Sequence, residues 1–399
     1  MKVTAIETIR IDEFPNLLWV QVRTDEGLTG TGETFFGVEA AEAHIHALIA
    51  PYLLGQDPRL VSRHWSHLMG YVGFHGSSAE QRGRSAVDIA LWDIWGQSTA
   101  QPIHDLLGGT VRDDIRVYNT CAGNRYALNN PVHDSANFGI DTASSDRYED
   151  LDAFLHRADD LAHSLLEMGI TGMKIWPFDF AAEASNGTYI SAADLDRALT
   201  PFRKIRDAVG DRMDVMAELH ALWNVPAGRQ VIAALEPYTP LWIEDPVYMN
   251  QLDSLGQMQA STRVQIATGE TLGGLGQFKE LLQNGGCGVA IMDLTWCGGI
   301  SEARRITALA DAWHTSVAFH DCTGPIALTA STHMALNASN CFVQEIVRAF
   351  YYGWYGDLVT ALPPVEDGRI RAPEGSGLGL ALNADRLAQP DVHIRRSAS

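Results

Sequence analysis

Three glutamates follow short apolar runs at an even spacing along the chain. Glu218 ends MDVMAE, Glu244 lies in LWIED and Glu270 ends VQIATGE. If these runs are neighbouring strands, the three carboxylates meet at one edge and repel one another unless a cation lies between them. Oxygen ligands without histidine or cysteine favour a hard ion such as Mg²⁺. The pattern predicts one Mg²⁺ per subunit with these three ligands; the alternative is three unrelated surface glutamates.

A second pair of polar residues could move a proton. Asp293 ends GVAIMD, and His320 follows the next apolar run, SVAF. A carboxylate that orients and charges a neighbouring imidazole produces a competent general base. We therefore predict that His320 and Asp293 are catalytic, although a histidine–aspartate hydrogen bond can also be purely structural.

Three further residues are candidate catalytic groups. His220 lies two residues after Glu218, so on an extended strand end both would point to the same side, and His220 could protonate a leaving hydroxyl or only bind substrate. Lys174, in GMKIW, could neutralise a substrate carboxylate or be a surface lysine. Glu345, in FVQE, could donate a hydrogen bond to an enediolate oxygen if protonated, or form an ion pair with Arg348.

The spacing of these residues indicates the fold that positions them. Six polar residues end successive apolar runs about 25 residues apart, with helical periodicity between them. A doubly wound open sheet would give the same alternation, but it would not place polar residues at the ends of six successive strands. We therefore predict an α/β fold with a (β/α)7β TIM-like barrel over residues 113–350.

The two ends of the chain are expected to form a cap on this barrel. Residues 1–112 contain three strand patterns followed by amphipathic helices, which is typical of an N-terminal α+β capping domain. Residues 351–399 are rich in turns, have short strand signals and are expected to pack back on that domain. Residues 126–150 and 178–191 interrupt the repeat and are predicted to be rim loops.

Charge and composition narrow the class of partner. A net charge of −20 argues against nucleic acid and anionic membranes, which require a basic face. An acidic protein that binds an anionic small molecule needs a local positive charge, which a metal ion would supply. The sequence has no secretory signal and no apolar stretch long enough to cross a membrane, and its five cysteines are scattered, so we expect reduced thiols and a cytoplasmic location.

Together these motifs resemble the enolase superfamily and, within it, the mandelate racemase subgroup. The resemblance covers nearly the whole chain and includes RSAVDIALWDIWGQ, WIEDP, TGE and DLTWCGGISEARRI. It implies Mg²⁺ held by Glu218, Glu244 and Glu270, a substrate carboxylate on that ion, and removal of the α-proton to give an enolate stabilised by the metal. The muconate cycloisomerase subgroup would have lysine at Asp293 and is disfavoured.

Two departures from the family pattern suggest the reaction. The first metal ligand is Glu218, where the family often has aspartate. Mandelate racemase has a K-x-K motif, and this chain has Trp176 in place of the second lysine. One base is thereby lost, which counts against a two-base racemase. The pair Glu218-x-His220 is similar to the D-x-H of galactonate dehydratases. The resemblance therefore implies dehydration of a sugar acid, an aldonate or an aldarate, to a 2-keto-3-deoxy acid.

Other assignments are less constrained by the sequence. Candidates for contacting substrate are Asn119, Arg125 and Trp176, and the capping-domain candidates for specificity are Phe14, Trp19, Glu33–Gly37 and Tyr71–His75. The alternatives to a dehydratase are an epimerase, racemase or cycloisomerase of a related acid and, more distantly, a ligand-binding protein without turnover. We expect a small carboxylate substrate and a homo-oligomer, because large barrels often assemble symmetrically.

Overall fold

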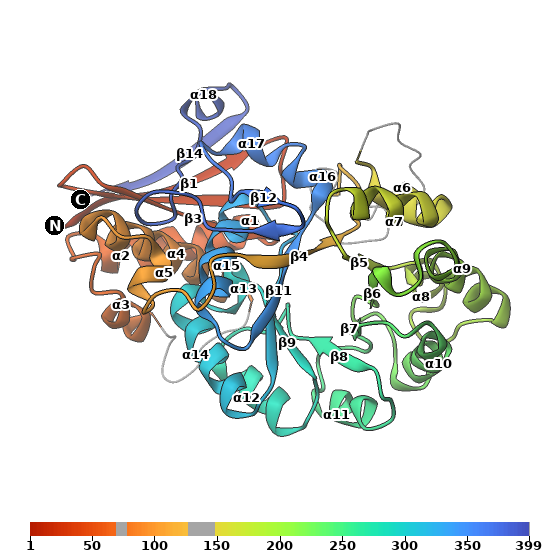
Figure 1. Cartoon of the computed structure of the whole chain (residues 1–399). Helices are drawn as coiled ribbons and strands as arrows, with labels where there is room; N and C mark the ends of the chain where they lie inside the picture. Colours follow the sequence, from red (N-terminus) through yellow and green to blue (C-terminus); the bar gives the residue numbers. More distant parts are fainter. Residues whose placement is uncertain (69–77, 127–147, 399) are drawn as a thin grey trace.

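The computed structural model describes residues 1–68, 78–126 and 148–398. Its central feature is a closed ring of eight parallel strands, β4 to β11 in chain order, in which β11 pairs back with β4 (Figure 1). The strands are β4 (Ile115–Thr120), β5 (Gly172–Ile175), β6 (Asp214–Glu218), β7 (Trp242–Glu244), β8 (Gln265–Thr268), β9 (Val289–Met292), β10 (Ser316–Phe319) and β11 (Cys341–Ile346). The predicted barrel is confirmed.

The ring closes around its own small core. Buried side chains from seven of the strands form a cluster separate from the main hydrophobic core, as expected for residues that fill the interior of a barrel. They are Tyr118, Met216, Trp242, Ala267, Val289, Ile291, Ala318 and Val343. Because alternate residues of a strand face opposite sides, the others pack outward against the helices. The interior is thus filled with side chains, and polar groups are left for the mouth.

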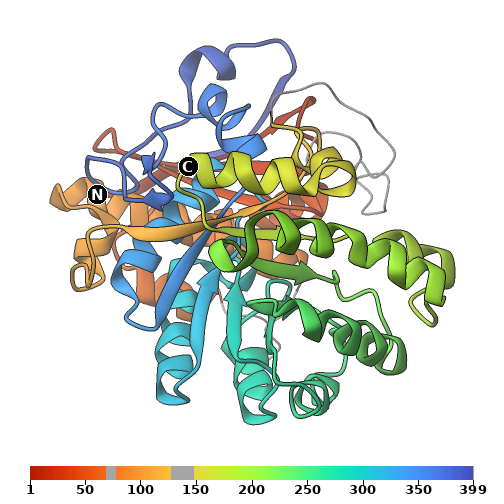
Figure 2. The ribbon, with the colours of Figure 1, turned by 45° about the vertical axis from the view of Figure 1, so that its right-hand side comes forward.

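Helices follow most of the strands and lie outside the ring (Figure 2). Those of the barrel are α6 (Asp150–His156), α7 (Ala158–Glu167), α8 (Asp179–Ser185), α9 (Ala192–Val209), α10 (Val225–Leu235), α11 (Asp253–Gln259), α12 (Leu275–Gln283), α13 (Leu294–Cys297), α14 (Gly299–Ala312), α15 (Pro325–Asn337), α16 (Arg348–Tyr351) and α17 (Tyr355–Leu358). The predicted rim loop 178–191 contains helix α8, and most of the other, 126–150, lies outside the described residues. Among the described helices, none is both long and apolar enough to cross a bilayer.

The capping domain is an antiparallel sheet covered by a long helix. Its strands are ordered β14 (Val392–Ala398), β1 (Val3–Ile11), β2 (Leu17–Thr24) and β3 (Thr29–Phe35). The C-terminal segment therefore packs back on the N-terminal domain as predicted, with β14 beside β1 in Figure 1. The helices of the capping domain are α1 (Val38–His44), α2 (Ala50–Leu53), α3 (Val61–His67), α4 (Ala79–Thr99), α5 (Ile103–Leu106) and α18 (Ala384–Leu387). Strands β12 (Val365–Glu366) and β13 (Arg369–Ile370) instead form a hairpin that extends the barrel sheet, because β13 pairs antiparallel with β4.

Helix α4 lies close against β3 because the strand carries two glycines. A Cβ atom at Gly30 would lie 2.0 Å from the Ala90 carbonyl oxygen, and one at Gly32 would lie 1.8 Å from that of Ala86. Any larger residue would push the helix away from the strand. This contact fixes the end of β3 relative to α4, and both elements contribute side chains to the site below.

The same helix attaches the capping domain to the barrel. The Asp88 carboxylate accepts hydrogen bonds from the backbone N–H of Ser301 at 2.9 Å and from its hydroxyl at 2.6 Å. Gln81 Nε2 donates to the Cys297 carbonyl oxygen at 2.6 Å, and the Gly298 N–H donates to Ser85 Oγ at 2.9 Å. Helix α4 is therefore held directly against the end of α13 and the start of α14, which follow β9.

Candidate active site

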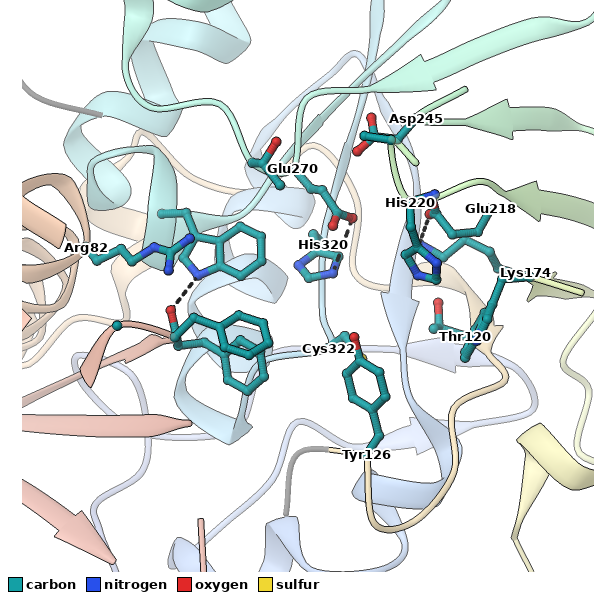
Figure 3. Close-up of a pocket in the computed structure, with 17 residues that line it drawn as sticks. Arg82, Thr120, Tyr126, Lys174, Glu218, His220, Asp245, Glu270, His320 and Cys322 are labelled. Carbon is teal, nitrogen blue, oxygen red and sulfur yellow. Dashed lines mark hydrogen bonds and ion pairs between the residues drawn. The ribbon is translucent and has the colours of Figure 1, made fainter. Parts of the chain in front are cut away.

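A cavity of about 460 Å³ lies between the barrel mouth and the capping domain (Figure 3). Its size is typical of a site for a small organic molecule. The lining includes six of the predicted site residues, which are Lys174, Trp176, Glu218, His220, Glu270 and His320. The barrel thus brings to one place side chains that lie as far apart in sequence as Lys174 and His320.

Three carboxylates converge at the barrel side of this cavity. Glu218 and Glu244 are the last residues of β6 and β7 and lie directly opposite each other in the sheet, and Glu270 follows β8. One oxygen of each lies within 4.8 Å of the others. Burial and the charge of Glu218 raise the pKa of Glu244 to about 8. A buried, oxygen-only set that repels itself fits a hard divalent cation.

The Lys174 ammonium lies beside this cluster. Its Nζ is 2.6 Å from Glu244, 3.4 Å from Glu218 and 3.0 Å from Glu345, and its side chain is almost fully buried. Burial lowers the pKa of Lys174, but the charges of Glu244 and Glu345 raise it well above its ordinary value. The lysine therefore stays charged and is the cation nearest the glutamates among the described residues.

His320 and Asp293 form the predicted pair. Nδ1 of His320 is 2.7 Å from Asp293 Oδ2, and Nε2 is 3.4 Å from Glu270 Oε2. An ionised Asp293 accepts a hydrogen bond from Nδ1–H, which leaves Nε2 on the side of Glu270. Burial lowers the pKa of His320, but the charges of Glu270 and Glu345 raise it well above its ordinary value.

Asp293 is itself held by two threonines. Thr323 Oγ donates to Oδ2 at 2.7 Å, while the backbone N–H and the hydroxyl of Thr295 both donate to Oδ1 at 2.6 Å. The carboxylate also caps the N-terminus of α13. Asp293 is therefore saturated with donors and fixes the orientation of the imidazole ring.

His220 reaches the cavity by a different local conformation from the one predicted. Strand β6 ends at Glu218, and His220 and Ala221 have left-handed backbones, with φ of 49° and 55°. The prediction of an extended strand end is wrong. The His220 N–H donates to Glu218 Oε1 at 2.6 Å, and this bond turns the chain while both side chains still line the cavity.

The partner of His220 was missed by the sequence reasoning. Its Nδ1 is 2.7 Å from Oδ2 of Asp179, a buried carboxylate in the first turn of α8. Burial lowers the pKa of His220, but the charges of Asp179 and Glu218 raise it to about 9. The imidazole is therefore a cation at neutral pH and can give up a proton. The signal was the aspartate in WPFD, three residues after Trp176.

Trp176 packs beside this histidine. Its ring meets the His220 ring edge to face, with centroids 5.6 Å apart. Its indole N–H is buried and has no hydrogen-bond acceptor among the described residues. A buried donor without a partner is costly, and the Trp176 side chain lines the cavity next to His220.

Glu345 lies behind Lys174 and is ionised. It accepts hydrogen bonds from the Thr120 hydroxyl and from the Asp321 N–H, the latter at 2.9 Å. Burial raises the pKa of Glu345, but the charges of Lys174 and His320 lower it below its ordinary value. The alternative ion pair with Arg348 is wrong, because the described structure pairs that guanidinium with Asp150.

Two of the predicted substrate contacts do not reach the cavity. Asn119 is buried outside it, where its amide donates to Asp150 at 2.8 Å and its carbonyl oxygen accepts from the Arg348 N–H at 2.7 Å. Arg125 is exposed and does not line the cavity. The β4 residue that lines the cavity is Thr120. It follows Asn119 on the strand, so its side chain points to the opposite face.

The capping domain contributes an aromatic wall. Phe35, Phe36 and Gly37 line the cavity beside Trp296 of α13 and Arg82 of α4. Of the other capping-domain candidates, Phe14 and Trp19 are buried in that domain's core, Glu33 is buried and accepts a hydrogen bond from Trp19, and 71–75 lie outside the described residues. Tyr126, Asp245, Thr271 and Cys322, which also line the cavity, were not predicted.

Comparisons with known proteins agree on one family. Residues 157–386 match the family model described as "Enolase C-terminal domain-like", and residues 3–108 match the one described as "Mandelate racemase / muconate lactonizing enzyme, N-terminal domain". A D-galactonate dehydratase of Ralstonia nicotianae is 31% identical over 96% of this chain and 92% of its own length. Another, from Xanthomonas campestris, is 30% identical over 97% and 94%.

Solved structures agree in fold. An enolase of the mandelate racemase subgroup from Agrobacterium tumefaciens is 50% identical, covers 100% of this chain and 99% of its own, and superposes with a TM-score of 0.89. An enolase protein from environmental sequencing of the Sargasso Sea is 41% identical, with the same coverage and a TM-score of 0.88.

Proposed function

The chain belongs to the enolase superfamily, in its mandelate racemase subgroup, and from this premise we propose that it is a Mg²⁺-dependent dehydratase of a sugar acid. The product is a 2-keto-3-deoxy acid, formed by removal of the α-proton and elimination of the β-hydroxyl as water. Two curated relatives are D-galactonate dehydratases, which supports this reaction class. The observation that carries the proposal is the presence of two histidine–aspartate pairs, His320 with Asp293 and His220 with Asp179, at one carboxylate-lined cavity.

One magnesium ion per subunit would be held by Glu218, Glu244 and Glu270. Their convergence to within 4.8 Å and the raised pKa of Glu244 support a cation between them. When bound, the ion supplies positive charge next to the substrate carboxylate and offsets the glutamate charge that raises the pKa of His320. Lys174, a charged neighbour of the same cluster, would neutralise the substrate carboxylate further.

The proton transfers are assigned to the two histidines. Neutral His320 takes the α-proton through Nε2, because Nδ1 is engaged by Asp293. The electron pair moves from the C–H bond into the enolate and then expels the β-hydroxyl. His220 donates the proton that turns this leaving group into water, and Asp179 stabilises the cationic ring before that step. The enol product then becomes the keto acid.

Substrate binding would involve Trp176 as well as the charged groups. Its ring lines the cavity and packs edge to face against His220, so it can contact the substrate beside that histidine. A tryptophan at this position cannot act as a base, which supports dehydration over two-base racemisation. We also propose that the substrate is a small carboxylate and that the protein forms a homo-oligomer, which light scattering would test.

A substrate screen tests the reaction class. Purified enzyme with Mg²⁺ is incubated with a panel of aldonates and aldarates, and keto acid is trapped with semicarbazide. We expect keto-acid formation from at least one member and none with His320→Asn. In deuterated water, α-hydrogen exchange in a substrate that keeps all its oxygens would instead indicate an epimerase. Binding without any turnover in wild type would support the non-catalytic alternative.

A further inference from the structure

An arginine that forms no ion pair with any described residue lines the capping-domain side of the cavity. Arg82, in the first turn of α4, forms no ion pair within the described ranges. Its guanidinium lies over the Trp296 indole, with Cζ 4.9 Å from the ring centroid. The chain has a net charge of −20, and the other permanent cation of the cavity, Lys174, lies among carboxylates. Arg82 is therefore a cation of the cavity that is not neutralised by an ion pair with the described residues.

The position of Arg82 is fixed by its surroundings. Its neighbour Gln81 donates to the Cys297 carbonyl oxygen at 2.6 Å, which holds this turn of α4 against α13. The Trp296 indole N–H donates to the Phe35 carbonyl oxygen at 3.1 Å, so the ring beneath the guanidinium is also anchored. The guanidinium is thus preorganised on an aromatic surface.

The Arg82 guanidinium is partly buried and forms no ion pair with the described residues, which makes it a candidate site for an anion. Desolvation lowers the pKa of Arg82, and only the charge of Asp293 opposes that effect. A partly buried guanidinium is stabilised most by a carboxylate, which can accept two parallel hydrogen bonds from it. Arg82 is the one arginine among the described residues that line the cavity. Its single positive charge matches the single negative charge of a carboxylate better than the two charges of a phosphate.

Arg82 and the part of the glutamate cluster around Lys174 and Glu218 lie on opposite sides of His320. In Figure 3, Arg82 is on one side of His320, and Lys174 and Glu218 are on the other. Two ring contacts separate the guanidinium from the imidazole, the 4.9 Å contact with Trp296 and a 5.4 Å contact between Trp296 and His320. An acid held by one carboxylate at the glutamates, with its α-carbon at His320, would extend its far end toward Arg82.

We propose that Arg82 binds the second carboxylate of a sugar diacid, so that the enzyme acts on aldarates in preference to aldonates. This inference rests on the proposed dehydratase function and refines its substrate class. It also separates this chain from its D-galactonate dehydratase relatives, whose named substrate has one carboxylate.

The test compares a diacid with the monoacid of the same configuration. Wild type is expected to have a higher kcat/KM for the diacid by roughly 10- to 100-fold, the usual effect of a hydrogen bond to a charged group. Arg82→Gln should lower kcat/KM for the diacid by about the same factor and leave that for the monoacid within about threefold. Arg82→Lys keeps the charge and should retain part of the preference.

Arg305→Gln is the matched control. Arg305 also lies on an indole, with Cζ 4.3 Å from the Trp65 centroid, but outside the cavity, so this variant should keep wild-type kinetics for both acids. Melting temperatures check that each variant is folded. A second readout avoids turnover: the affinity of both acids is measured for His320→Asn and for the double variant His320→Asn/Arg82→Gln.

Three results would overturn the inference. These are wild-type kcat/KM for the monoacid equal to or above that for the diacid, an equal loss for both acids in folded Arg82→Gln, and a preference for a terminally phosphorylated monoacid. All three leave the dehydratase proposal intact. Only the absence of keto acid from every acid tested contradicts that proposal itself.

Discussion

Replacing Asp293 by asparagine removes one charge from the site and leaves its size unchanged. All the hydrogen bonds to its two oxygens are short, with two donors at 2.7 Å on Oδ2 and two at 2.6 Å on Oδ1. An asparagine must turn its NH₂ group toward one of these donor pairs, so one pair loses its acceptor in either orientation. Asp293→Asn therefore keeps the His320 imidazole in the site but removes the carboxylate that orients it, so the variant tests the orientation alone.

The expected magnitude follows from what each orientation does. If the NH₂ group faces His320, the ring must accept through Nδ1 and carry its proton on Nε2, where it cannot take the α-proton. If the group faces Thr295, the N-terminus of α13 loses its cap and the loop that carries the imidazole's partner is loosened. A positioned base contributes about 10²- to 10⁴-fold, so kcat should fall by that factor with little change in KM.

Two readouts on the same acid measure this effect. Trapped keto acid reports the whole reaction, and deuterium incorporation at the α-carbon reports proton abstraction; both should fall together. Asp93→Asn is the matched control, because Asp93 is a buried capping-domain carboxylate that accepts from the N–H groups of Thr31 and Leu378. It should lower the melting temperature and leave kcat unchanged. A folded Asp293→Asn variant with kcat near wild type would refute His320 as the oriented base.

Three further outcomes are expected. His220→Gln should retain α-hydrogen exchange in deuterated water while keto-acid formation falls about 100-fold or more; equal loss of both would contradict its role in elimination. Trp176→Phe should raise KM about 10-fold with kcat unchanged, and a lower kcat would argue against a binding role. Burial lowers the pKa of His333 to about 3, so between that value and about 6.5 the unfolded state binds one more proton at this residue, and the contribution of His333 to stability falls with decreasing pH by about 1.4 kcal/mol per unit. His333→Gln should remove this slope in denaturant titrations from pH 4.5 to 6, and an unchanged slope would contradict the assignment.

The barrel and the central residues could be predicted because they depend on strand ends. In a parallel barrel the carboxyl ends of all strands meet at one mouth, whatever the helices and loops between them do. An even spacing of polar residues after apolar runs was therefore enough to bring together Glu218, Glu244 and Glu270, and to place His320 beside Asp293.

The rest depends on details that spacing does not determine. Asn119 and Thr120 are adjacent on β4, and the choice of the cavity-facing residue was wrong by one position. Asp179 reaches His220 only because a helix forms inside a predicted loop. Arg82 comes from the capping domain, and its position depends on how α4 packs on α13. Such contacts between domains leave no periodic signal in the sequence.

The central claim is that glutamates from three neighbouring strands hold one divalent cation. The most direct measurement is a crystal grown with Mn²⁺ in place of Mg²⁺, with anomalous scattering used to locate the ion. We predict a single strong peak per subunit between Glu218, Glu244 and Glu270, with one oxygen of each at a coordination distance of about 2 Å. No peak there at saturating Mn²⁺, or a peak held by other residues, would contradict the account.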